Sequence, residues 1–84
     1  MTIKDDIKKQ IIYRSSHRGT KEMDILFGNF VKRHINDLNI NDLKDLQKII
    51  LIEDEILYKW YFNKIDNSLI PNNAVSIMLR SFKL

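Results

Sequence analysis

The residues best suited to chemistry lie close together between Arg18 and Asp24. A guanidinium (Arg18), a glycine (Gly19) and two carboxylates (Glu22 and Asp24) fall within seven positions. Glycine adopts backbone angles that cost other residues energy, so Gly19 can end one helix or open the next. The two carboxylates then fall in a first helical turn, where the helix dipole favours anions. The segment therefore predicts a polar corner that offers both signs of charge.

Two interpretations of this corner are open. In the first, Gly19 stops a helix, Glu22 stabilises the start of the next helix and Arg18 is solvated, so the corner only shapes the fold. In the second, the same residues contact another molecule, and Arg18 contributes its five-donor guanidinium fork to that contact. The residue types alone do not separate the two.

The rest of the chain has no recognisable catalytic or cofactor-binding set. It lacks a glycine-rich phosphate loop and a nucleotide-binding fingerprint. It has no cysteine, which excludes disulfides and thiolate metal sites. Neither His17 nor His34 has a second histidine or a carboxylate at metal-ligand spacing, and no serine has an evident base. We therefore expect a protein that is not an enzyme, has no metal site and binds no cofactor stably.

Length and composition limit the size and the surroundings of the protein. A chain of 84 residues has room for one domain, here residues 1–84. Its longest apolar run, residues 49–52, is far too short to span a membrane. The N-terminal residues lack the apolar core of a secretory signal. We therefore expect a soluble cytoplasmic protein without direct membrane insertion.

The charge pattern argues against a nucleic-acid partner. The formal net charge is +3, and the lysines are scattered among acidic residues. Nucleic-acid binders usually concentrate basic residues on one face. Glu22 and Asp24 also stand at the start of the helix that would have to read DNA. A helical nucleic-acid-binding module is therefore only a less favoured alternative.

Apolar residues recur with helical spacing in every long segment, and no segment alternates as a strand does. The pattern predicts helices at about residues 3–15 and 20–35, and a third from a cap at Asn39 or Asn41 to about residue 51. A fourth helix at about 55–65 is expected to be capped by Asp54, and a fifth by Asn72 or Asn73. The expected fold class is all-α, a small antiparallel five-helix bundle.

Two of these helices have notable surfaces. The second has a core-facing stripe at i, i+3, i+4 and i+7 spacing: Met23, Leu26, Phe27, Phe30, Val31 and Ile35. Gly28 lies off this stripe and can let a neighbouring helix or a partner approach closely. The fourth helix is apolar nearly all round, so part of its aromatic area is expected to be exposed or to meet a partner. A monomer is expected, with a dimer left open.

Two blocks of the chain resemble the succinate dehydrogenase flavinylation factors, known as the SdhE or flavinator family. The first block, residues 13–30, contains the family's hallmark Arg-Gly-x-x-Glu as Arg18, Gly19 and Glu22, followed by Asp24. The second block, residues 51–60, resembles the family's acidic turn, which a leucine, an aromatic residue and a tryptophan follow. Length and helix number agree too, so the resemblance covers most of the chain.

The resemblance implies an assembly chaperone that binds the flavoprotein subunit of succinate dehydrogenase, fumarate reductase or both. Such factors promote covalent attachment of FAD to a histidine of that subunit, so the FAD is held by the client protein. The implied client-binding residues are the hallmark positions and three flanking contacts: Arg18, Gly19, Glu22, Asp24, Tyr13, Arg14 and His17. A generic helical protein-interaction module is the main alternative.

Overall fold

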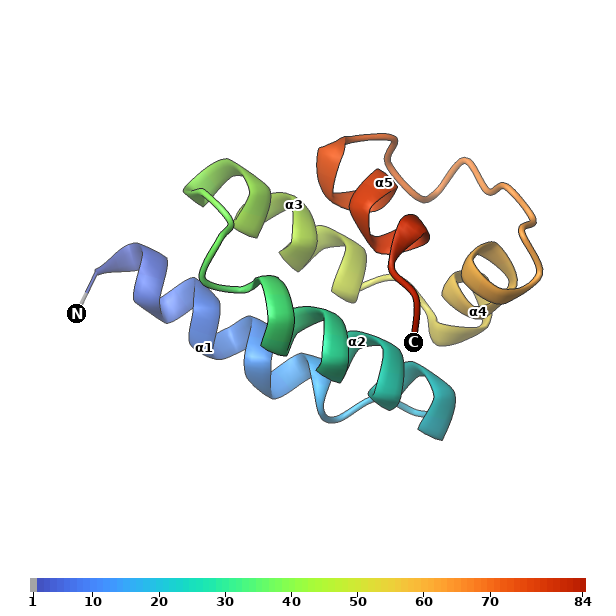
Figure 1. The fold of residues 1–84 in the computed structure, drawn as a ribbon, viewed down its shortest axis with the longest axis horizontal. Coiled ribbons are helices and arrows are strands. Elements are labelled where there is room, and N and C mark those ends of the chain that lie inside the picture. Colours follow the sequence, from blue (N-terminus) through green and yellow to red (C-terminus); the bar gives the residue numbers. More distant parts are fainter. Residues whose placement is uncertain (1) are drawn as a thin grey trace.

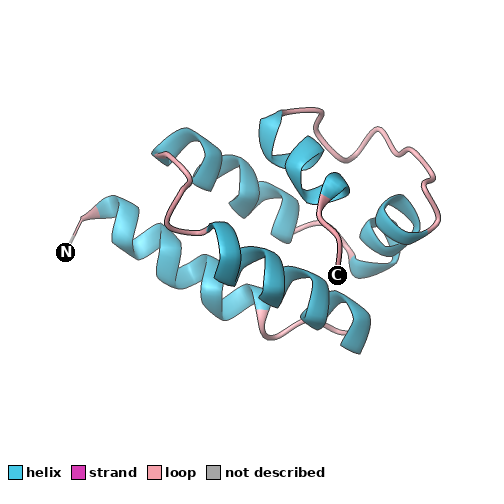
Figure 2. Cartoon of the chain, in the orientation of Figure 1, coloured by secondary structure: helices cyan, strands magenta, loops and turns pink. Residues whose placement is uncertain are grey.

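The computed structural model describes residues 2–84, which form five helices joined by short loops (Figure 1, Figure 2). In chain order the helices are α1 (Ile3–Ser15), α2 (Lys21–His34), α3 (Ile40–Ile50), α4 (Asp54–Phe62) and α5 (Ala74–Ser81). Residues 2–84 contain no strand. The all-α five-helix prediction is therefore confirmed.

The first three helices form the body of the molecule. α2 runs antiparallel to α1, and α3 turns back to run in the direction of α1, against which it also packs (Figure 1). α5 packs on α3, while α4 lies beyond the end of α3 (Figure 1). This arrangement brings the end of α1, the start of α2 and the start of α4 to one corner of the molecule.

One continuous apolar core fills the space between the helices. The predicted stripe of α2 is confirmed, since all six of its residues are buried. α3 contributes Leu43, Leu46, Ile49 and Ile50, and α4 contributes Leu57, Trp60 and Tyr61. At Gly28, a Cβ atom would meet no other atom within 4 Å. The predicted close approach of a neighbouring helix at Gly28 is therefore wrong, and any approach there would have to come from a partner.

Side-chain caps open four of the five helices. The hydroxyl of Thr20 accepts a hydrogen bond from the Met23 amide at the start of α2. Asn39 caps α3 and Asn73 caps α5, each being one of the two residues that the sequence left open. These caps satisfy backbone amides that have no partner within the helix, so they fix where each helix begins.

The fourth helix differs from its prediction at both ends. It begins at Asp54, its N-cap is Glu53, and no side chain caps it. The predicted cap at Asp54 is wrong because the carboxylate of this residue bonds to the corner before α2 instead. The helix ends at Phe62, three residues early, because Lys64 adopts a left-handed φ of 58° and the helical path breaks there.

Candidate functional site

The guanidinium of Arg18 lies inside the corner rather than on its surface. Its side chain is only 7% exposed. Nη1 donates to the carbonyl oxygen of Ile50, and Nη2 donates to that of Ile52 at 3.2 Å. The guanidinium carbon also lies 4.8 Å from the centre of the Phe27 ring. The predicted offer of positive charge by Arg18 is therefore wrong, because this residue ties the α3–α4 turn to the start of α2.

Asp54 neutralises this buried cation and holds the neighbouring backbone. Its Oδ1 accepts from Arg18 Nε at 2.9 Å and also from Nη2, which makes a two-donor ion pair. Its Oδ2 accepts from the backbone amide of Gly19 at 2.8 Å. One carboxylate from α4 thus binds two consecutive residues of the hallmark segment. The sequence analysis missed this role because the bonds join residues 35 and 36 positions apart.

Gly19 does not use the conformational freedom expected of it. No described glycine has a positive φ, so the prediction of a special backbone conformation at Gly19 is wrong. The chain leaves α1 at Ser16 and enters α2 at Thr20 through backbone angles that other residues also adopt. Gly19 is exposed, and a Cβ atom at this position would lie 3.4 Å from Asp54 Oδ2.

Asp24 holds the same segment from the other side. Its Oδ1 accepts from the backbone amide of Arg18 at 2.6 Å. Because Asp24 lies in the first turn of α2, its charge is also favoured by the helix dipole. Asp24 and Asp54 therefore each hold a backbone amide of the hallmark, and both carboxylates are partly buried.

Glu22 is the hallmark residue whose charge remains available. It lies in the first turn of α2 and is exposed. Its carboxylate makes no hydrogen bond or ion pair with any residue of the described chain. The surface of the corner is therefore acidic at Glu22, while the charge of Arg18 is compensated inside.

Two shallow hollows flank Asp54 at the surface. One, of about 380 Å³, is lined by residues such as Arg14, Gly19 and Glu53. The other, of about 450 Å³, is lined by residues such as Glu22 and Tyr58 of α4. Asp54 lines both hollows, so they form one continuous surface around the hallmark. This surface can bind a partner, but it does not enclose a ligand.

The three predicted flanking residues lie along the first hollow. The rings of Tyr13 and His17 stack with their centres 4.1 Å apart. Nδ1 of His17 lies 2.7 Å from the carbonyl oxygen of Tyr13, and because a carbonyl only accepts, Nδ1 carries the hydrogen. Arg14 is exposed in the last turn of α1 and makes no ion pair within residues 2–84. Arg14 is therefore an available cation beside the corner.

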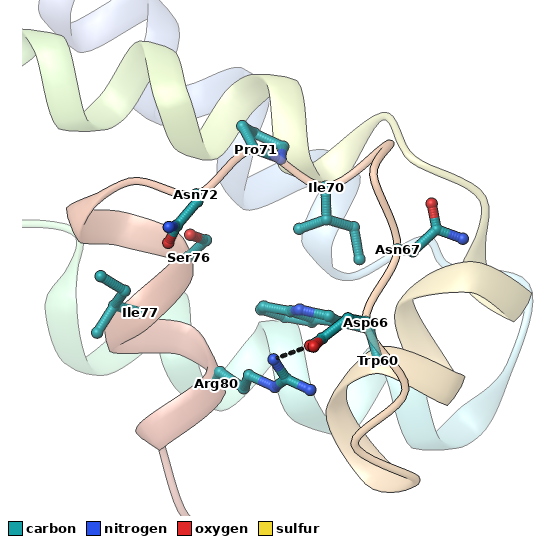
Figure 3. Close-up of a pocket in the computed structure, with 9 residues that line it drawn as sticks. All are labelled: Trp60, Asp66, Asn67, Ile70, Pro71, Asn72, Ser76, Ile77 and Arg80. Carbon is teal, nitrogen blue, oxygen red and sulfur yellow. Dashed lines mark hydrogen bonds and ion pairs between the residues drawn. The ribbon is translucent and has the colours of Figure 1, made fainter.

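A more enclosed cavity of about 380 Å³ lies between α4, α5 and the loop that joins them (Figure 3). Arg80 reaches from α5 to pair with Asp66 of the loop at 2.6 Å, beside the Trp60 ring (Figure 3). The Asp66 side chain is 88% exposed, so solvent weakens this pair. None of these residues was a predicted site residue, and their contacts tie the loop to α5.

The described chain contains no cluster of three histidine, cysteine or acidic side chains that could hold a metal ion. None of its helices is both long and apolar enough to cross a membrane. The corner presents the exposed carboxylate of Glu22 and the exposed guanidinium of Arg14 beside a hydrogen-bonded backbone. Such an arrangement can position another protein through hydrogen bonds and ion pairs.

Comparison with known proteins gives a family match over most of the chain. A family model described as the flavinator of succinate dehydrogenase matches residues 9–83. This range contains both the hallmark corner and Asp54, the residue of α4 that binds it. No solved structure matches the chain significantly.

Several curated relatives carry related names. The FAD assembly factor SdhE of Acetobacter pasteurianus is 32% identical over 73 residues, which are 87% of this chain and 64% of that protein. The mitochondrial succinate dehydrogenase assembly factor 2 of Arabidopsis thaliana is 35% identical over 51 residues, which are 61% of this chain and 27% of that protein. The protein of that name from Dictyostelium discoideum is 27% identical over 62 residues, which are 74% of this chain and 44% of that protein. The chain thus spans less than two thirds of the length of these relatives.

Proposed function

We propose that this protein is an assembly factor for succinate dehydrogenase. The chain belongs to the flavinator family of that enzyme, and this membership supports the proposal. The factor binds the flavoprotein subunit and promotes covalent attachment of FAD, which the client holds. The observation that carries this proposal furthest is the hallmark corner, where a braced backbone presents Gly19 and the unpaired Glu22 to solvent.

The corner suits a factor that positions a client rather than one that performs the chemistry. Attack of a client histidine on the flavin methyl carbon requires close alignment and stabilisation of the charge that develops on the ring. The client's own residues can supply these groups once its domains are correctly oriented. We infer that the factor is not itself an enzyme and that its contribution is orientation.

We infer different roles for the exposed and the buried residues of the hallmark. Glu22 and Gly19 are the residues that contact the client, with Arg14 as the nearby cation, since all three are exposed. Arg18 and Asp24 act from inside, because both are bonded to the corner's own backbone or side chains. A charge-assisted hydrogen bond from the client to Glu22 would fix the register of the complex.

The first test is co-expression of the flavoprotein subunit with the wild-type protein, with Glu22→Ala, or without either. Covalent flavin is measured by in-gel fluorescence of the denatured subunit. Wild-type protein is expected to raise the fluorescence, and Glu22→Ala to lower that gain at least tenfold while the variant stays folded. Unchanged fluorescence with wild-type protein and a folded, FAD-supplied client would favour a generic interaction module instead.

Asp37→Ala is the matched control for Glu22→Ala. It removes an exposed carboxylate that follows the opposite end of α2, about 20 Å away for a helix of this length. We expect Asp37→Ala to support flavinylation as the wild-type protein does. Equal losses from both variants would mean that net charge, not the corner, determines activity.

Several finer points belong to the same proposal. Running the assay with the fumarate reductase flavoprotein would decide whether the factor serves one client or both. A monomer in the cytoplasm remains our expectation for the free protein. Light scattering and cell fractionation would test these two expectations.

A further inference from the structure

We propose that Asp54 is a positioning residue, which holds the Arg18–Gly19 backbone in the form that the client recognises. The inference rests on the proposed function, because it concerns the same corner. It goes further by assigning a role to a residue of α4 that lies outside the hallmark. Asp54 acts through its neighbours and need not contact the client.

The geometry of the carboxylate supports this role. Its two oxygens have separate tasks: Oδ1 receives the guanidinium of Arg18, and Oδ2 receives the amide of Gly19. The side chain is 18% exposed, so water competes only partly with these bonds. Charge-assisted bonds of this kind are stronger and more directional than neutral ones.

The bonding pattern of α4 shows that this carboxylate serves the corner rather than its own helix. An acidic residue at the start of a helix commonly caps free amides there, yet α4 has no side-chain cap. The hydrogen bonds of the Asp54 side chain run to the segment before α2. The flanking Glu53 and Glu55 are exposed and bind neither hallmark residue. Asp54 is therefore the link through which α4 sets the conformation of the hallmark.

The remaining anchors of Arg18 suggest how the corner would change without this link. The carbonyl oxygens of Ile50 and Ile52 still accept from the guanidinium, so the arginine keeps part of its binding site. The amide of Gly19 has no other acceptor within the described residues and would bond to water instead. Loss of Asp54 should therefore loosen the exposed part of the hallmark more than the helices around it.

The chain offers a direct probe of this local effect. It has only two glycines, so labelling with ¹⁵N-glycine gives two amide signals, one from Gly19 and one from Gly28. Gly28 lies inside α2 and reports global unfolding. In the wild-type protein, the Gly19 amide should exchange slowly with deuterium because Asp54 accepts its hydrogen.

Three variants complete the experiment. Asp54→Asn removes the charge. Asp54→Glu keeps the charge beside Arg18 but displaces the carboxylate by one methylene. Because the buried guanidinium stays paired, this variant can still be tested if Asp54→Asn unfolds. Asp42→Asn is the matched control, because Asp42 lies in the first turn of α3, away from the corner (Figure 1). We expect at least tenfold faster exchange at Gly19 in both Asp54 variants, with Gly28 unchanged in Asp54→Glu.

The same variants are then titrated in the flavinylation assay. We expect the factor concentration that gives half-maximal covalent FAD to rise at least tenfold for Asp54→Glu, with Asp42→Asn at the wild-type value. Unchanged Gly19 exchange, or unchanged half-saturation in a variant with fast exchange, would overturn the positioning role. Failure of the wild-type protein to raise covalent FAD would instead overturn the proposed function, and the Gly19 exchange rates would still report the Asp54 contact.

Discussion

Two residues of the same short motif, Arg18 and Glu22, occupy opposite environments. The guanidinium is buried against a carboxylate, two carbonyl groups and an aromatic ring, whereas the Glu22 carboxylate faces solvent without a partner. Loss of a buried charged partner destabilises a fold, while loss of an exposed carboxylate does not. Substitutions at the two positions should therefore impair function for different reasons.

Gly19→Ala separates the space around the hallmark from its backbone conformation. An added Cβ would lie 3.4 Å from Asp54 Oδ2, which is an ordinary contact, and φ at Gly19 is not positive. We expect the free energy of unfolding to be unchanged or raised by about 0.5 kcal/mol, as measured by urea denaturation. Covalent flavinylation should nevertheless fall, because the new methyl group stands where the client approaches.

The outcome that contradicts this prediction is a large loss of stability. If Gly19→Ala lowers the free energy of unfolding by more than about 2 kcal/mol, the glycine is required by the fold and not by the client. Full flavinylation with a stable variant would show that the client does not approach this surface closely.

Tyr61 should make the protein sensitive to alkaline pH. The side chain is 8% exposed, and its hydroxyl donates to the carbonyl oxygen of Phe82. Burial raises the pKa of Tyr61 above its usual value of 10.0, because the charged phenolate is poorly solvated. Between about pH 10 and the raised pKa, the folded state therefore keeps a proton that the unfolded state has lost. The stabilisation is fully present below about pH 10 and is lost as pH rises through the raised pKa.

Tyr61→Phe measures this contribution. Near pH 8 the variant should be about 1 kcal/mol less stable than the wild-type protein, since a hydrogen bond is lost. The difference should shrink or reverse near pH 11, because only the wild-type protein then has a buried phenol to ionise. Urea unfolding at both pH values provides the comparison. Tyr13→Phe, at a residue that is 63% exposed, is the matched control for removing a phenol hydroxyl.

Among the single elements, α4 and α5 of the C-terminal half begin in different ways. α4 begins without a side-chain cap and gives its first carboxylate to the corner, whereas α5 begins with a complete capping box. α5 is short, so its stability depends on that cap and on its packing against α3. The first carboxylate of α4 therefore holds the hallmark corner, whereas the cap of α5 stabilises its own helix.

Asn73→Ala should weaken the start of α5. Asn73 accepts from the Ser76 amide at 2.9 Å, and Ser76 Oγ accepts from the Asn73 amide at 2.9 Å. The substitution removes the first of these bonds. We therefore expect the free energy of unfolding to fall by about 1 kcal/mol and Tm, measured by calorimetry, to fall by about 4–8 °C. Asn72→Ala, one residue earlier and exposed, should change Tm little. Equal effects at both positions would contradict the cap.

On the scale of the whole molecule, the helices share one core and leave little surplus stability. The radius of gyration is 12.0 Å, close to the value of about 12 Å expected for a folded domain of this length. A domain of 84 residues has a free energy of unfolding of about 4–13 kcal/mol. One cavity in the shared core can therefore remove much of that stability.

Leu46→Ala and Leu69→Ala make the same chemical change in opposite surroundings. Leu46 of α3 is fully buried, whereas Leu69 is 64% exposed. We expect Leu46→Ala to cost about 2–5 kcal/mol and Leu69→Ala less than about 0.5 kcal/mol in urea denaturation. A small effect at Leu46 would mean that the core between α1, α3 and α5 collapses to fill the cavity.

The sequence by itself determined the features that depend on neighbouring residues. Helical spacing located five helices and the buried stripe of α2, because apolar residues recur at a regular period on the face that each helix buries. Local residue types also narrowed the caps of α3 and α5 to two candidates each. The hallmark segment pointed to the family, and the match over residues 9–83 bears this out.

Only the tertiary structure decided which charges the corner offers. Arg18 and Asp54 lie 36 positions apart, and no local pattern reveals that they bind each other once α4 reaches the start of α2. Helical spacing also could not foresee that α4 ends at Phe62, because Ile65 continues the apolar spacing while the left-handed backbone at Lys64 stops the helix. Long-range contacts depend on the whole fold. The exposed carboxylate of Glu22 and the buried guanidinium of Arg18 are therefore properties of the structure.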